Sequence, residues 1–131
     1  MIKIWAGDKD LMKISSAATL LFNKDSVGPL YKPYLVEGKN GYQFNSVIKD
    51  SILFEYHDVL NENPYPEADI IFCRDLLSFL NIESQKKLLA DFHEKLKPNG
   101  LLFLGVNESA FRENWTSCES GALIAFQKET R

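Results

Sequence analysis

The sequence predicts an α/β protein in which helices flank a mostly parallel sheet. Short β-branched and aromatic runs alternate with segments of helical periodicity along the chain. Residues 68–106 read strand, helix, strand at the spacing of a parallel crossover connection. A chain of 131 residues that is 45% hydrophobic is long enough to bury one core. We therefore expect residues 1–131 to form a single domain.

The first half of the chain contains two predicted strands and a helix. Residues 2–8 open with β-branched and aromatic side chains and end in a polar turn, as a short buried strand does. Residues 11–22 follow helical spacing, with Asp10 placed to cap the first turn. The Gly- and Pro-rich residues 23–41 predict a connector with at most a short helix. Residues 52–56 alternate and predict a second strand.

The second half gives the clearest pattern. Residues 69–73 predict a strand, and Asn81 is placed to cap a long amphipathic helix that residues 98–100 terminate. Residues 101–106 are continuously apolar, which is typical of a strand buried on both faces of a parallel sheet. Residues 122–127 predict one more strand, antiparallel and at the edge of the sheet.

Composition excludes several classes of function. A net charge of −3 and a pI near 5.4 argue against nucleic acid and anionic membranes as main partners. The only cysteines, Cys73 and Cys118, form neither a disulfide framework nor zinc-ligand spacing, and we expect two free thiols and no metal site. The apolar runs are far shorter than the about 20 residues that cross a bilayer. We expect a cytoplasmic protein that binds small molecules or other proteins.

Polar residues follow each predicted strand, where open parallel sheets bind their ligands. A carboxylate after the second strand of a nucleoside-binding sheet can accept hydrogen bonds from two ribose hydroxyls, and Asp8 is the candidate for this role. A turn, a helix cap or a surface ion pair explains any one of these residues equally well. The coincidence at three strand ends favours a ligand site. The candidates in chain order are Asp8, Asp58, Cys73, Arg74, Asp75, Asn107 and Glu108.

Two motifs in the second half resemble the signature of CheR-type chemotaxis methyltransferases. The run ADIIFCRDLLSFL followed by LKPNGLLFLGVNES is similar to the family's strand, CRN tripeptide, YF-containing helix and L-x-P-x-G-x-L-x-x-G-x-x-E. Upstream, IWAGDKD, GYQF and ILFEYHDVL are similar to the segments of the family's second and third strands. The resemblance spans the chain and is specific over residues 50–109. It implies a partial Rossmann-like methyltransferase fold and a pocket for S-adenosylmethionine or S-adenosylhomocysteine.

Site residues carried over by this resemblance lie at the strand ends. It makes Asp8 the ribose ligand, places Asp58 and Val59 beside the adenine, and makes Arg74 and Asp75 pocket residues after the central strand. It assigns no catalytic residue and no metal ligand to this chain.

The sequence also departs from the family. It lacks the family's first strand with its small-residue Gly-Glu-Glu-Pro-like loop, and the helical N-terminal domain. That strand normally lies between the second and fourth, so either these two pair directly, or another copy of the chain or another part of a longer protein fills the gap. Alternatively, residues 4–22 stand for the first strand and helix. Asp75 and Phe79 occupy positions where the family usually has Asn and Tyr.

These departures shape the functional expectation. The leading hypothesis is a degenerate, non-catalytic CheR-like module of chemotaxis signalling that binds or senses S-adenosylmethionine or acts as a scaffold. The alternative is a fragment of an active protein-glutamate O-methyltransferase that acts on chemoreceptors, and a third possibility is an interaction domain without a ligand. Expected partners are chemotaxis array proteins or chemoreceptors, with a homodimer or pairing with another domain of a longer protein.

Overall fold

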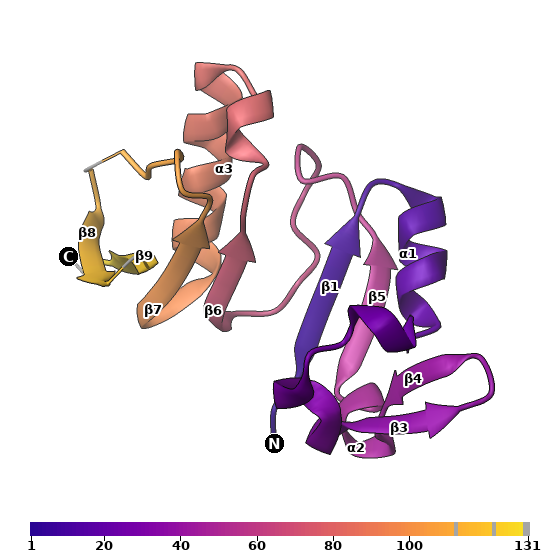
Figure 1. Cartoon of the computed structure of the whole chain (residues 1–131). Helices are drawn as coiled ribbons and strands as arrows, with labels where there is room; N and C mark the ends of the chain where they lie inside the picture. The colour runs from indigo at the N-terminus through magenta and orange to yellow at the C-terminus, as the bar shows by residue number, and fades with distance from the viewer. Residues whose placement is uncertain (112, 122, 130–131) are drawn as a thin grey trace. The chain divides into compact units, whose positions relative to one another are not determined.

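The computed structural model describes residues 1–111, 113–121 and 123–129. They form two compact units, Met1–Asn61 and Glu62–Arg131 (Figure 1). Both units combine helices with a parallel strand pair, which confirms the α/β class. No helix in these described residues is long and apolar enough to span a bilayer. The elements in chain order are β1 (Ile4–Asp8), α1 (Leu11–Ala18), β2 (Leu21–Phe22), η1 (Lys24–Ser26), η2 (Pro29–Tyr34), β3 (Leu35–Gly38), β4 (Gly41–Phe44), α2 (Ser46–Lys49), β5 (Ile52–Tyr56), β6 (Ala68–Cys73), η3 (Leu77–Phe79), α3 (Ile82–Lys95), β7 (Leu96–Leu104), β8 (Trp115–Ser120) and β9 (Leu123–Lys128).

The first unit is built on the parallel pair of β1 and β5, with α1 packed beside them. The carboxylate of Asp10 accepts hydrogen bonds from the N–H groups of Met12 and Lys13, as the sequence predicts for a helix cap. The helix is shorter than expected and ends at Ala18. Its end coincides with a left-handed backbone at Leu20, whose φ of 53° is incompatible with a continuing helix.

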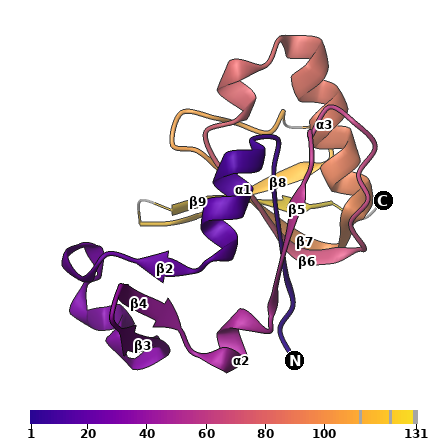
Figure 2. The same ribbon diagram turned by 90° about the vertical axis from the view of Figure 1, so that its right-hand side faces the viewer.

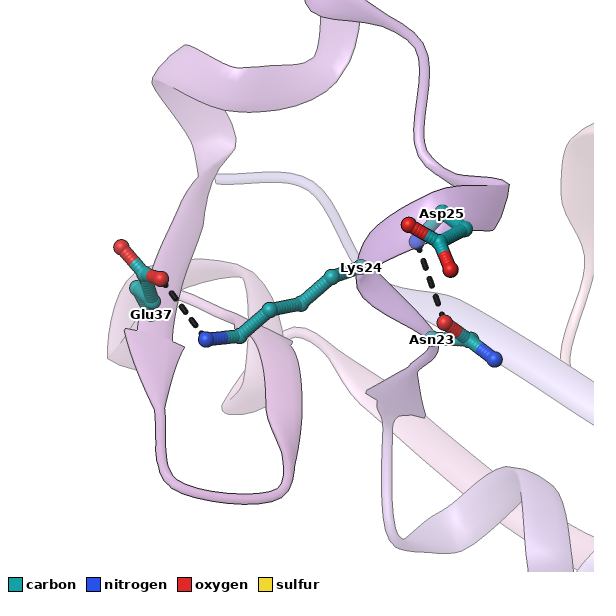
Figure 3. A network of polar contacts seen from close by, with 4 residues as sticks. All are labelled: Asn23, Lys24, Asp25 and Glu37. Atoms are coloured by element: carbon teal, nitrogen blue, oxygen red, sulfur yellow. Dashed lines mark hydrogen bonds and ion pairs between the residues drawn. The ribbon is translucent and has the colours of Figure 1, made fainter.

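A small antiparallel sheet replaces the connector expected at residues 23–41. Its strand order is β2-β4-β3, and two 3₁₀ helices join β2 to β3. Lys24 Nζ lies 2.8 Å from Glu37 Oε1, and Asn23 Oδ1 accepts the N–H of Asp25 (Figure 3). The expectation was wrong because strands of two to four residues interrupted by Gly and Pro carry no detectable alternation. The small sheet lies toward the amino-terminal ends of β1 and β5, which are labelled in Figure 1, and Figure 2 shows the small sheet from the side.

The second unit contains the predicted crossover. Its sheet has the order β6-β7-β9-β8, in which β6 and β7 are parallel and the other pairs antiparallel. α3 connects the parallel strands, and Asn81 Oδ1 accepts the N–H of Ser84 at its first turn, as predicted. The buried apolar face of α3 consists of Leu88, Leu89 and Phe92. This unit therefore carries a helix packed on a sheet.

Two expectations for the second sheet were wrong. β7 is not buried on both faces: Leu102 and Leu104 are buried, whereas Leu101 and Phe103 are half-buried. Phe72, the register partner of Phe103, is 71% exposed and stacks on it. The strand expected at residues 122–127 is β9, but it lies between β7 and β8 rather than at the edge. Residue 122 itself lies outside the described residues, and β8 was not expected.

Candidate functional site at the carboxyl ends of the parallel strands

In the first unit, three of the expected site residues meet at one edge of the sheet. Asp8 is the last residue of β1 and stands in register with Tyr56, the last residue of β5. The N–H of His57 donates to the carbonyl of Asp8 at 3.0 Å, so the chain leaving β5 is held against the end of β1. Asp58 and Val59 follow directly. Two acidic residues and one aliphatic residue therefore lie at or just beyond the carboxyl edge of this pair.

Both carboxylates also close local turns. Asp8 Oδ1 accepts the N–H of Asp10 at 2.8 Å, and Asp58 Oδ1 accepts the N–H of Leu60 at 3.0 Å. From the sequence, a turn role explained these residues as well as ligand binding did, and these bonds show the turn role. An ionised carboxylate offers two oxygens and about four acceptor directions, so one turn bond leaves capacity for the hydroxyls of a ligand. The two roles are therefore compatible at Asp8 and Asp58, which are both half-buried.

A small cavity adjoins Asp8 between α1 and the parallel strands. Its volume is about 190 Å³, which is below the roughly 300 Å³ at which small-molecule pockets begin. It therefore holds at most part of a nucleoside. The lining residues are Ala6, Gly7, Asp8, Lys13, Ile14, Ala17 and Phe54.

In the second unit, Arg74 and Asp75 directly follow β6, and both are exposed. Asp75 has a left-handed backbone, with φ of 61°. Asp and Asn adopt this region more readily than other non-glycine residues, which accounts for an acidic residue where the family usually has Asn. Of the five site residues that the resemblance implied, three therefore lie in the first unit and two in the second.

Glu108, a strand-end candidate to which the resemblance gave no specific role, organises the edge of the second sheet. Its Oε1 accepts the N–H groups of Asp75 at 2.7 Å and Gly105 at 2.8 Å, and its Oε2 accepts the N–H of Ser78 at 2.9 Å. A Cβ at position 105 would lie too close to the carboxylate oxygens of Asp75 and Glu108, so a larger residue would force these side chains to move. The available signal was the final position of the G-x-x-E part of the signature.

The electrostatics of this edge keep Glu108 ionised and Cys73 neutral. Burial alone raises the pKa of Glu108, but hydrogen bonds from the backbone N–H groups of Ser78, Gly105 and Asp75 outweigh it and hold the pKa below its usual range. Burial raises the pKa of the Cys73 thiol to about 12, and the nearby Glu108 carboxylate contributes. Cys73 is therefore protonated at neutral pH and unsuited to act as a nucleophile.

Sequence comparison identifies relatives among chemotaxis methyltransferases. Chemotaxis protein methyltransferase 2 of Vibrio cholerae is 32% identical over 119 residues, which cover 85% of this chain and 41% of that protein. A chemotaxis protein methyltransferase of Listeria monocytogenes is 33% identical over 73 residues, 56% of this chain and 28% of that protein. The chain thus spans less than half the length of either relative.

Solved structures with a similar fold include methyltransferases. The N-methyltransferase NodS of Bradyrhizobium japonicum superposes with a TM-score of 0.62 at 13% identity, over 98% of this chain and 74% of NodS. This likeness confirms the partial Rossmann-like methyltransferase fold. The family described as CheR methyltransferase, SAM binding domain, matches residues 1–123 and so extends across both units. The chain belongs to the CheR methyltransferase family and matches its S-adenosylmethionine-binding domain, whose cofactor is the one that the resemblance implied.

Proposed function

We propose that this chain forms the adenosine-binding part of an S-adenosylmethionine-dependent protein-glutamate O-methyltransferase that acts on chemoreceptors in the cytoplasm. The observation that carries the proposal is the meeting of Asp8, Asp58 and Val59 at the carboxyl edge of two adjacent parallel strands. Parallel α/β sheets bind nucleosides at this edge. The chemotaxis methyltransferase of Vibrio cholerae, at 32% identity, supports the choice of reaction and substrate.

The chemistry of the residues fits the adenosine end of the cofactor. Asp8 accepts hydrogen bonds from the ribose hydroxyls with the carboxylate capacity that its turn bond leaves. Asp58 and Val59 would hold the adenine, for which an aliphatic side chain is a suitable neighbour. The family match over residues 1–123 supports treating the two units as parts of one domain that covers residues 1–131.

In the second unit, the 74–75 turn carries charge that suits the methionine part of the cofactor. When bound, adenosylmethionine supplies an electrophilic methyl group on a sulfonium centre. Asp75 places a negative charge suited to a sulfonium, and Arg74 places a guanidinium suited to a carboxylate. Methyl transfer to a glutamate depends chiefly on aligning the carboxylate oxygen, the methyl carbon and the leaving sulfur.

A second candidate is the non-catalytic module that senses adenosylmethionine. Phe79 favours it, because this side chain is 83% exposed and lacks the hydroxyl that the family usually carries at this position. The same adenosine-side residues serve both candidates. Transfer of a radiolabelled methyl group to chemoreceptor glutamates, assayed with the chain and any native sequence that precedes it, separates them. Binding without transfer favours the sensor.

Isothermal titration calorimetry with S-adenosylhomocysteine tests the shared binding function. Asp8→Asn keeps the turn-forming side chain and removes the charge, so we expect affinity to fall at least about 10-fold with the fold retained. Asp25→Asn, on an exposed 3₁₀ helix of the same unit, is the matched control and should bind like the wild type. Binding is refuted if the wild type gives no heat with either adenosylmethionine or its demethylated product at micromolar protein concentrations.

A further inference from the structure

We propose that Glu108 is a positioning residue of the cofactor site. Its carboxylate fixes the backbone of the 74–75 turn after β6, and this sets the direction in which Arg74 and Asp75 meet the cofactor. The effect of Glu108 on cofactor binding rests on the proposed function. The role of Glu108 in fixing the turn rests only on the geometry of the second unit.

The carboxylate of Glu108 connects two loops that are far apart in the sequence. Its bonds to Asp75 and Ser78 span 33 and 30 residues, whereas its bond to Gly105 lies within its own loop. All three donors are backbone N–H groups at 2.7 to 2.9 Å, the range of charge-assisted hydrogen bonds. One side chain therefore holds the ends of two neighbouring parallel strands, β6 and β7, in fixed register.

The turn that Glu108 holds has an uncommon backbone. Asp75 lies in the left-handed region, which is uncommon for a residue with a Cβ, although Asp adopts it more readily than most, and a suitable contact stabilises it there. The bond from the N–H of Asp75 to Glu108 is such a contact. Gly105 completes the arrangement, because any larger residue would displace both carboxylates. The turn is thus fixed by a bond across the sheet edge and by the space that a glycine leaves.

Among the residues that the structure describes, Asp75 and Cys73 are the titratable groups recorded close to the Glu108 carboxylate. The carboxylates of Asp75 and Glu108 both flank Gly105, so their repulsion must be offset, and the three N–H donors do this for Glu108. The thiol of Cys73 stays neutral because burial raises its pKa to about 12. The Glu108 carboxylate is therefore used in hydrogen bonds within the protein, whereas the exposed Asp75 side chain is available to a ligand.

NMR spectroscopy of the ligand-free chain tests the cause. In the wild type, the amide protons of Asp75, Ser78 and Gly105 should shift together as Glu108 titrates at acid pH, while amides of α3 report that the fold persists. Glu108→Gln should abolish this common titration and move all three resonances. Asp75→Asn removes the neighbouring carboxyl and should preserve it.

The matched charge control is Glu119→Gln, which removes a carboxylate from an exposed position of β8 and should leave the three resonances unchanged. The proposal is overturned if the three amides titrate independently, or if Glu108→Gln leaves their shifts as in the wild type. Neither readout depends on a ligand, so this test is separate from that of the proposed function.

Calorimetry with S-adenosylhomocysteine tests the consequence. With the fold intact by NMR, Glu108→Gln should bind at least 10-fold more weakly than the wild type, and Glu119→Gln should bind equally. Equal binding by Glu108→Gln despite an altered turn overturns the positioning role. If the wild type shows the common titration but binds neither cofactor form, the proposed function fails and the role of Glu108 in fixing the turn stands.

Discussion

The two units differ sharply in how much apolar surface they bury. Among the described residues, the first unit contributes only Leu20 to the buried apolar side chains, and its helix α1 has no buried residue. The second unit packs α3 on a four-stranded sheet. Its buried apolar residues are Cys73, Leu77, Leu88, Leu89, Phe92, Leu96, Leu102, Leu104, Ala110, Trp115, Ala125 and Phe126. Because burial is the main favourable term in folding, stability should be concentrated in the second unit.

The same contrast holds at the strand ends. Asp8 and Asp58 are each held by a turn bond to a residue two positions ahead, so their placement follows from local sequence. Asp75 is held by Glu108 across 33 residues, so its placement depends on the tertiary structure. Asp8 and Asp58 therefore lie in the weakly packed unit and are placed by local turns. The turn after β6 lies in the well-packed unit and is placed by a contact between distant parts of the chain.

Removing a core side chain from β7 should give the largest effect. Leu102 is fully buried, and Leu102→Ala should lower the free energy of unfolding of the second unit by about 3–4 kcal/mol through lost burial and the cavity left behind. Each unit carries one tryptophan, Trp5 in β1 and Trp115 in β8. Urea unfolding followed by ¹⁹F NMR of 5-fluorotryptophan-labelled protein reports the two separately.

The control is Leu123→Ala, in the neighbouring part of the same sheet, where the side chain is 63% exposed. It should cost less than about 1 kcal/mol. In the wild type, the Trp5 resonance should lose its native shift at lower urea than that of Trp115. Coincident transitions for both tryptophans in every variant would contradict the contrast between the units.

Replacing Glu108 should give an intermediate effect that depends on pH. The pKa of Glu108 is lowered in the folded protein, so its ionised form stabilises the second unit above the ordinary glutamate pKa of about 4.3. That contribution is lost as pH falls through the lowered folded-state pKa. Glu108→Gln should cost about 2 kcal/mol at pH 7 and progressively less in acid. Thermal unfolding from pH 7 to pH 3, compared with Glu119→Gln, measures this difference. A cost that is independent of pH would show that the ionised carboxylate is not the stabilising group.

Much of the second unit could be predicted from the sequence because its signals are local and strong. Asn81 indicates the start of α3, and the helical spacing of Leu88, Leu89 and Phe92 predicts its buried face. The burial of β7 could not be predicted, because a continuous apolar run does not reveal how many faces a neighbouring element covers. The small sheet was missed because its strands are too short. β2 has only two residues, too few to show the two-residue alternation of a strand.

The candidate site shows the same limit. The rule that ligands bind at the carboxyl ends of parallel strands selected the strand-end candidates, Glu108 and Asp75 among them, without coordinates. Nothing in the local sequence indicated that the carboxylate of Glu108 accepts the N–H of Asp75. That bond exists because parallel register brings the ends of β6 and β7 side by side, with Cys73 opposite Leu104. Sequence signals thus identify strand-end residues, and tertiary structure decides which of them hold one another.

Removing a helix cap from each unit should give the smallest effect and the finest comparison. Asp10→Ala and Asn81→Ala each delete one side-chain acceptor, a loss of about 1 kcal/mol. α1 has eight residues and none buried, so it is shorter than the roughly 12–15 residues at which isolated helices become even marginal and has little packing to retain it. α3 has 14 residues with three buried.

We therefore expect Asp10→Ala to abolish amide-exchange protection throughout α1, whereas Asn81→Ala lowers protection only in the first turn of α3. Asp10→Asn and Asn81→Asp keep a capping side chain and should behave like the wild type. Equal loss of protection in the two helices would mean that the buried face of α3 gives it no more support than α1 receives.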